Sequence, residues 1–114
     1  MYLFNSLSLP LILLFTFMNT ILGDSFITHT GKIGFLDVVR SQVIALYFTA
    51  HWCPPCRAFT PLLIKFFNDV NERGKRLEVI FVSADKDQAS YNEYYNTMPW
   101  IAIPYGDSRI EILQ

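Results

Sequence analysis

The sequence contains little charge, and neither sign dominates. Nine Lys and Arg residues stand against ten Asp and Glu residues among 114, so the formal net charge is −1 and only 17% of the residues are charged. A protein that binds nucleic acid or anionic membranes would need a basic surplus, which is missing here. The length also excludes a large multidomain enzyme, because it suffices for one small domain at most.

Cysteine and histidine are scarce as well. Cys53 and Cys56 are the only cysteines, and His29 and His51 are the only histidines. A structural zinc site needs four ligands, and only Cys53, Cys56 and His51 share one segment, so zinc binding is disfavoured. A structural disulfide is disfavoured too, because the chain entropy that a cross-link removes grows with loop length and this loop is very short.

Hydrophobic residues, in contrast, are plentiful at the N-terminus. The first two dozen residues contain no Lys or Arg and no acid before Asp24, and Leu7 to Leu22 reads LSLPLILLFTFMNTIL. Such an apolar run is typical of the hydrophobic part of a secretory signal, which we expect to be cleaved after Gly23.

Two other roles for this segment stay open. The stretch from Tyr2 to Leu22 is just long enough to span a bilayer as an uncleaved anchor, and it could also be an extension without a role. We predict a signal-like leader over residues 1–23 and a domain over residues 24–114. The predicted location is the secretory pathway or the outside of the cell, with the cytosol as the alternative, and membrane contact is expected only from an uncleaved anchor.

The rest of the sequence alternates between strand-like and helix-like patterns. VIALYFTA (43–50) and LEVIFVSA (77–84) are unbroken apolar runs, which are typical of strands buried on both faces. Between them, apolar residues recur at helical spacing until Gly74, and Pro61 inside this pattern predicts a kink. A strand, a crossover helix and a second strand make a right-handed βαβ unit with parallel strands.

The flanking elements are shorter. A turn-rich stretch and a short segment precede the βαβ unit, and a capped helix, an extended segment and the start of another helix follow it. In chain order, these cover residues 28–34, 35–39, 88–96, 100–104 and those from 107 on.

The two cysteines lie where the first buried strand passes into the helix, in WCPPCR. Unpaired N–H groups and the positive end of the dipole stabilise a thiolate at a helix N-terminus, so Cys53 is the expected nucleophile. Cys56 lies one turn deeper and can close a disulfide with Cys53, which releases a mixed-disulfide partner. Pro54 and Pro55 suit the first helical turn and stiffen it. A C-x-x-C pair beside a βαβ unit is typical of dithiol redox chemistry.

These motifs resemble a known family. WCPPCRAFTPLL, preceded by ALYFTAH and followed by EVIFVSAD and MPWIAIPYGD, is similar to the tryparedoxin and nucleoredoxin branch of the thioredoxin superfamily over about residues 43–114. The resemblance implies an α/β, thioredoxin-like three-layer fold around the central βαβ unit, and a thiol:disulfide oxidoreductase. It implies an attacking cysteine, a resolving cysteine, an active-site loop and a substrate-facing tryptophan: Cys53, Cys56, the loop residues Trp52, Pro54, Pro55 and Arg57, and Trp100.

Two further residues near the pair carry expectations. Tyr47 occupies the strand position where ordinary thioredoxins have a buried acid and tryparedoxins have an aromatic residue. His51 either influences the titration of the thiols or is a solvated residue at the end of a strand.

The resemblance also implies partners. We expect disulfide-containing proteins or small dithiols as substrates and an external reductase as electron source, because the chain has no nucleotide-binding fingerprint. No metal or organic cofactor and no nucleic acid is expected.

Members of this branch continue beyond the matched region with a cis-proline loop, a β-hairpin and a final helix. We therefore expect a domain that is incomplete at its C-terminus, either as a fragment or as a natural short form. The alternative function is a truncated, catalytically impaired, nucleoredoxin-like secreted factor that binds or signals.

Overall fold

The computed structural model describes residues 2–5, 20, 22–38 and 40–114. Within these residues, six strands form one mixed sheet in the order β1-β4-β5-β6-β2-β3. The elements are β1 (Tyr2–Asn5), β2 (Ser25–Thr28), β3 (Gly31–Gly34), α2 (Phe35–Val38), β4 (Val43–Thr49), α3 (Pro54–Val70), β5 (Leu77–Ser83), α4 (Gln88–Tyr95), β6 (Ile101–Ala102) and α5 (Arg109–Leu113).

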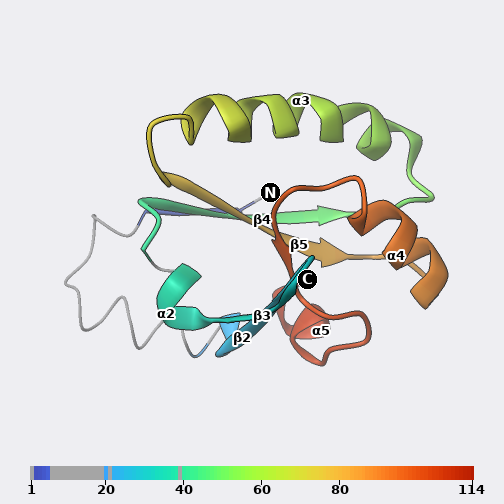
Figure 1. Ribbon diagram of the computed structural model, residues 1–114. Coiled ribbons are helices and arrows are strands. Elements are labelled where there is room, and N and C mark those ends of the chain that lie inside the picture. The colour runs from blue at the N-terminus through green and yellow to red at the C-terminus, as the bar shows by residue number, and fades with distance from the viewer. Residues whose placement is uncertain (1, 6–19, 21, 39) are drawn as a thin grey trace.

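Helices cover both faces of the sheet, which confirms the predicted three-layer α/β fold (Figure 1). Alternate residues of the central strands point to opposite faces, as the strand period of two requires. On one face, Tyr47 and Phe81 pack with residues of α3 and α4, and on the other face Leu46 and Ile80 pack with residues of α2. α5 contributes Ile110 to this second face.

The predicted βαβ unit forms the centre of the fold. β4 and β5 pair in parallel from Val43↔Leu77 to Thr49↔Ser83, and α3 connects them. The helix continues through Pro61 and ends at Val70, where Asn71 is its cap. Gly74, the predicted end, lies beyond the helix at a φ of 136°. The Asn71 side chain stops the helix earlier, because its Oδ1 accepts hydrogen bonds from the backbone of the returning chain.

The turn-rich stretch after residue 28 is a correction to the sequence prediction. It forms the second half of an antiparallel hairpin, in which Ser25 pairs with Gly34 and Thr28 with Gly31. β2 also pairs with β6 through Ile27 and Ala102. Strands of four residues give too little local periodicity to be recognised, and here the pairing partners stabilise them.

The N-terminal residues also take part in the sheet. β1 pairs antiparallel with β4, from Tyr2↔Leu46 to Asn5↔Val43, although the sequence places this segment in a leader. Residues 6–19 and 21 of the predicted leader lie outside the described residues. Leu22 is buried in the core, so the predicted boundary between leader and domain falls within the packed structure. None of the helices formed by the described residues has the length and apolar character needed to cross a membrane.

Candidate redox site

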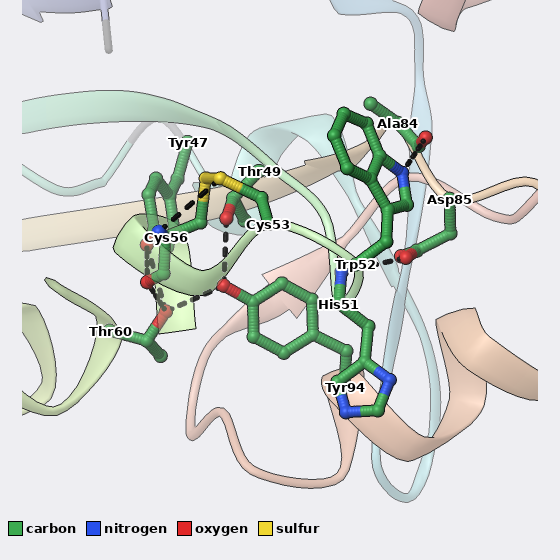
Figure 2. Close-up of a disulfide and its surroundings, with 10 residues drawn as sticks. All are labelled: Tyr47, Thr49, His51, Trp52, Cys53, Cys56, Thr60, Ala84, Asp85 and Tyr94. Atoms are coloured by element: carbon green, nitrogen blue, oxygen red, sulfur yellow. Dashed lines mark hydrogen bonds between the residues drawn. A yellow bond between two sulfur atoms is a disulfide. The ribbon is translucent and has the colours of Figure 1, made fainter. Parts of the chain in front are cut away.

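Cys53 and Cys56 form a disulfide at the N-terminus of α3 (Figure 2). Their Cα atoms lie 5.2 Å apart, Cys53 is the N-cap residue, and Pro54 and Pro55 occupy the first two helical positions. The backbone N–H of Cys56 donates a hydrogen bond to Cys53 Sγ at 3.4 Å. A helix N–H that points at the sulfur stabilises a thiolate there, so the geometry favours Cys53 as the thiolate-forming cysteine.

Trp52 lies beside the disulfide with its ring accessible to solvent. The side chain is 58% exposed, and its Nε1 donates a hydrogen bond to the carbonyl of Ala84 at 2.9 Å. The Lys86 ammonium lies 5.5 Å from the ring centroid, within the range of a cation–π interaction. The indole is therefore held in place while one apolar surface next to the disulfide stays available.

Asp85 anchors the loop that precedes the cysteines, and sequence reasoning missed it. Its Oδ1 accepts a hydrogen bond from the His51 backbone N–H at 2.7 Å, and its Oδ2 accepts one from Ser83 Oγ at 2.7 Å. The signal was present, because an acid directly after a buried parallel strand lies at the same sheet edge as the loop after the neighbouring strand.

A network of buried hydroxyl groups lies beneath the disulfide (Figure 2). Thr60 Oγ1 is its centre: it lies 2.8 Å from the Tyr47 hydroxyl, 2.8 Å from the Tyr94 hydroxyl and 3.0 Å from the Cys56 carbonyl, to which it donates. The Tyr94 hydroxyl also lies 2.7 Å from Thr49 Oγ1. The network thus joins β4, α3 and α4 directly below Cys56.

The number of hydroxyl protons determines the direction of this network. Each hydroxyl donates only one hydrogen bond. When Thr60 donates to the Cys56 carbonyl, Tyr94 donates to Thr60 and Thr49 donates to Tyr94. The Tyr47 hydroxyl has two acceptors within reach, Thr60 Oγ1 at 2.8 Å and the Cys56 carbonyl at 3.3 Å. Burial raises the pKa of Tyr94, which keeps its hydroxyl protonated. Tyr47 takes part in this hydroxyl network, at the strand position where the resemblance places a buried acid in ordinary thioredoxins.

His51 and Arg57 flank the disulfide on the α4 side. His51 is half-buried, its Nδ1 lies 3.7 Å from a Glu93 carboxylate oxygen, and its ring lies against Tyr94. Arg57 is exposed in the first turn of α3. His29, the other histidine, is in a separate place, where it stacks on Tyr95. Among the described residues, no three His, Cys, Asp or Glu side chains are grouped to hold a metal ion.

Trp100 does not have the predicted substrate-facing position. It is only 2% exposed, and its ring packs edge-on against Tyr47 and Phe67 in the core between the sheet and α3. The reason is the alternation along the chain at β6. Ile101 faces the opposite core, so Trp100 must face the α3 side.

Comparisons with known proteins show the family of the chain. The family model described as Thioredoxin-like matches residues 41–114, which is more than half of the chain. The chain belongs to this thioredoxin-like family. Within the superfamily it falls in the nucleoredoxin and tryparedoxin-like branch, as the sequence motifs predicted.

Two curated relatives show how much of their sequence this chain shares. Probable nucleoredoxin 1 from Arabidopsis thaliana is 47% identical over 92 residues, which are 81% of this chain and 15% of that protein. Nucleoredoxin from Danio rerio is 47% identical over 69 residues, 60% of this chain and 16% of that protein. The chain therefore spans a small part of the curated relatives that it matches.

Solved structures show the same fold. Native tryparedoxin I from Crithidia fasciculata superposes with a TM-score of 0.76 at 31% identity, covering 84% of this chain and 67% of that one. Thioredoxin from Wuchereria bancrofti superposes with a TM-score of 0.73 at 36% identity, covering 82% of this chain and 66% of that one. The family and the close cysteine pair support dithiol–disulfide chemistry in general.

Proposed function

We propose that this protein is a thiol:disulfide oxidoreductase of the nucleoredoxin and tryparedoxin type, which reduces disulfides in proteins or small molecules. The observation that carries the proposal is the hydrogen bond from the Cys56 N–H to Cys53 Sγ at the N-terminus of α3. It supports different roles for the two cysteines, because only Cys53 occupies the capping position that stabilises a thiolate.

The reaction proceeds by two thiol–disulfide exchanges. The Cys53 thiolate attacks one sulfur of the partner disulfide, forms a mixed disulfide with it, and the second partner sulfur leaves as a thiolate. Cys56 then loses its proton and attacks Cys53 Sγ, which forms the Cys53–Cys56 disulfide and expels the first partner sulfur. Two electrons pass to the partner, and an external dithiol or a reductase returns them to the protein.

The surroundings of the cysteine pair support Cys53 as the attacking cysteine and Cys56 as the resolving cysteine. Cys56 lies over the hydroxyl network, with its carbonyl held by Thr60, so the resolving cysteine is fixed to the fold. Trp52 offers an exposed apolar surface beside the disulfide. A partner can therefore approach Cys53 over Trp52 while Cys56 stays below.

Insulin reduction with dithiothreitol tests the proposal. We expect the purified protein to accelerate the precipitation of insulin chains, and the Cys53→Ser variant to act no faster than dithiothreitol alone. Equal rates for the two proteins would contradict the proposed reaction. That outcome would favour the alternative function, a secreted factor that binds without turnover, whose binding Cys53→Ser leaves intact.

Residues 1–23 are proposed as a secretory signal. The support is the apolar run without basic or acidic residues before Asp24. Expression in secreting cells with a C-terminal tag, followed by N-terminal sequencing of the exported protein, tests this. A mature protein that begins at Asp24 is expected. A tagged protein that stays in the cytosol with its N-terminus intact would contradict it.

A further inference from the structure

A small pocket lies beside the disulfide, between α3 and α4. Its volume is about 290 Å³, at the lower end of the range for ligand sites. Two buried residues of the hydroxyl network, Thr60 and Tyr94, line it together with the apolar side chains of Pro61 and Ile64. The space suits one side chain of a partner better than a whole cofactor.

Two charged side chains lie at this pocket, Arg57 in its lining and Glu93 near His51. His51 and Arg57 line it, and a Glu93 carboxylate oxygen lies 3.7 Å from His51 Nδ1. Within the described residues, the Arg57 guanidinium makes no ion pair. An exposed guanidinium beside an apolar pocket fits a carboxylate, which it can bind through two hydrogen bonds. The floor carries no negative charge, because Tyr94 stays neutral.

We propose that this pocket is a specificity subsite for the partner, which receives an apolar side chain flanked by an acidic residue whose carboxylate binds Arg57. The position supports this, because Arg57 directly follows Cys56 and Thr60 bonds to the Cys56 carbonyl. A partner segment in the pocket would therefore lie next to the cysteine pair, which attacks the disulfide of the partner. The substrate role rests on the proposed function, whereas binding to the pocket does not.

The first experiment measures binding to the oxidised full chain, where no redox step takes place. In ¹H–¹⁵N NMR titrations, 3-phenylpropionate serves as the apolar carboxylate and 3-phenyl-1-propanol as its neutral counterpart. We expect shifts at His51, Arg57 and Thr97, and tighter binding of the carboxylate. Arg57→Gln should reduce the ratio of the two affinities by about tenfold, because it removes a charge-assisted contact.

Arg73→Gln is the matched control, since Arg73 is an exposed arginine beyond the other end of α3. It should leave the ratio of affinities unchanged. Shifts that map elsewhere, no shifts at all, or an equal loss in both arginine variants would overturn the proposal.

The second experiment tests the substrate role. The Cys56→Ser variant attacks a disulfide once and keeps the mixed disulfide, so its rate reports recognition without turnover. Disulfide peptides with a Phe-Asp pair moved stepwise along the sequence are compared with a Ser-Asn series. At one position, the Phe-Asp peptide should react about five to ten times faster. Arg57→Gln should lower this ratio, because it removes the contribution of the Asp carboxylate and leaves that of the Phe side chain.

The outcomes of this experiment test the subsite and the proposed function separately. If both peptide series react equally at every position, the subsite is refuted while the proposed function stands. If no mixed disulfide forms with any peptide, the proposed function fails, and the binding titration alone decides whether the pocket takes an apolar carboxylate.

Discussion

Thr60→Val tests whether the buried hydroxyl network beneath the disulfide stabilises the fold. Thr60 is 3% exposed, and valine has a similar shape, so the change removes the hydroxyl without opening a large cavity. Tyr47 can still donate to the Cys56 carbonyl, at 3.3 Å. Tyr94 and Thr49 still bond to each other, but only one of the two can donate, so one buried O–H loses its acceptor.

The expected loss of stability follows from this one buried O–H without an acceptor. A buried donor without an acceptor costs about 1–3 kcal/mol, so we expect the free energy of unfolding to fall by about 2 kcal/mol. In a domain of this size, 1 kcal/mol lowers Tm by about 4–8 °C, so Tm should fall by roughly 10 °C. The measurement is urea and thermal unfolding followed by circular dichroism on the oxidised protein.

Two variants control this measurement. Thr97→Val removes an exposed threonine whose hydroxyl donates to the Tyr94 carbonyl, and it should cost less than 1 kcal/mol. Tyr94→Phe combined with Thr60→Val should cost less than the two single changes added together, since the unpartnered tyrosine hydroxyl is gone. If Thr60→Val costs no more than Thr97→Val, or if the double variant is additive, the reasoning about the network is refuted.

Three further predictions concern the cysteines and the buried titratable groups. Cys56→Ser should accumulate a mixed disulfide with a protein partner, and Cys53→Ser should not; mass spectrometry under non-reducing conditions that finds the adduct on Cys56 instead would reverse the assignment of roles. Burial raises the pKa of Glu78 in spite of its ion pair with Lys75, so the folded state binds the proton more tightly than the unfolded state. The free energy of unfolding therefore falls as the pH rises from about 4.5, the ordinary value, through the folded pKa. Glu78→Gln should therefore stabilise the protein at pH 7 and not at pH 4, with exposed Glu72→Gln as the control, and equal effects of both changes at pH 7 would contradict this. Burial raises the pKa of Tyr95 to about 12, so the stability that the protonated Tyr95 contributes is complete below pH 10 and is lost between pH 10 and 12. An ultraviolet titration should show that Tyr95 ionises together with unfolding. Ionisation of Tyr95 near pH 10 in the folded protein would contradict this prediction.

The centre of the fold could be predicted because its signals are long. The two apolar strands and the helix between them each extend over seven or more residues, and their different periods identify them without knowledge of contacts. The four-residue strands β1, β2 and β3 have no such signal. β1 and β2 depend on pairing with strands that lie far away in the sequence, β1 with β4 and β2 with β6, and β3 in turn pairs with β2.

The candidate site divides in the same way. The cysteine pair was found because its two members are three residues apart at the start of a helix. Asp85 and the hydroxyl groups of Thr49, Thr60 and Tyr94 were not found, because they come from three different elements and the segment after β5, which only the fold brings together. The prediction that Trp100 faces the substrate was wrong, because its side chain is buried. Trp100 directly precedes the two-residue strand β6, and so short a strand gives no alternation from which the direction of its side chain could be predicted.

The sequence by itself predicted dithiol–disulfide chemistry, since covalent spacing and the helix N-terminus act within one turn and need no distant partner. Only the tertiary structure decided what surrounds that chemistry. A network of buried hydroxyl groups lies below Cys56, an exposed indole lies beside the disulfide, and a pocket next to Arg57 opens between α3 and α4. The physical reason is that burial and hydrogen-bond partners belong to the packing of whole elements, which local sequence patterns do not contain.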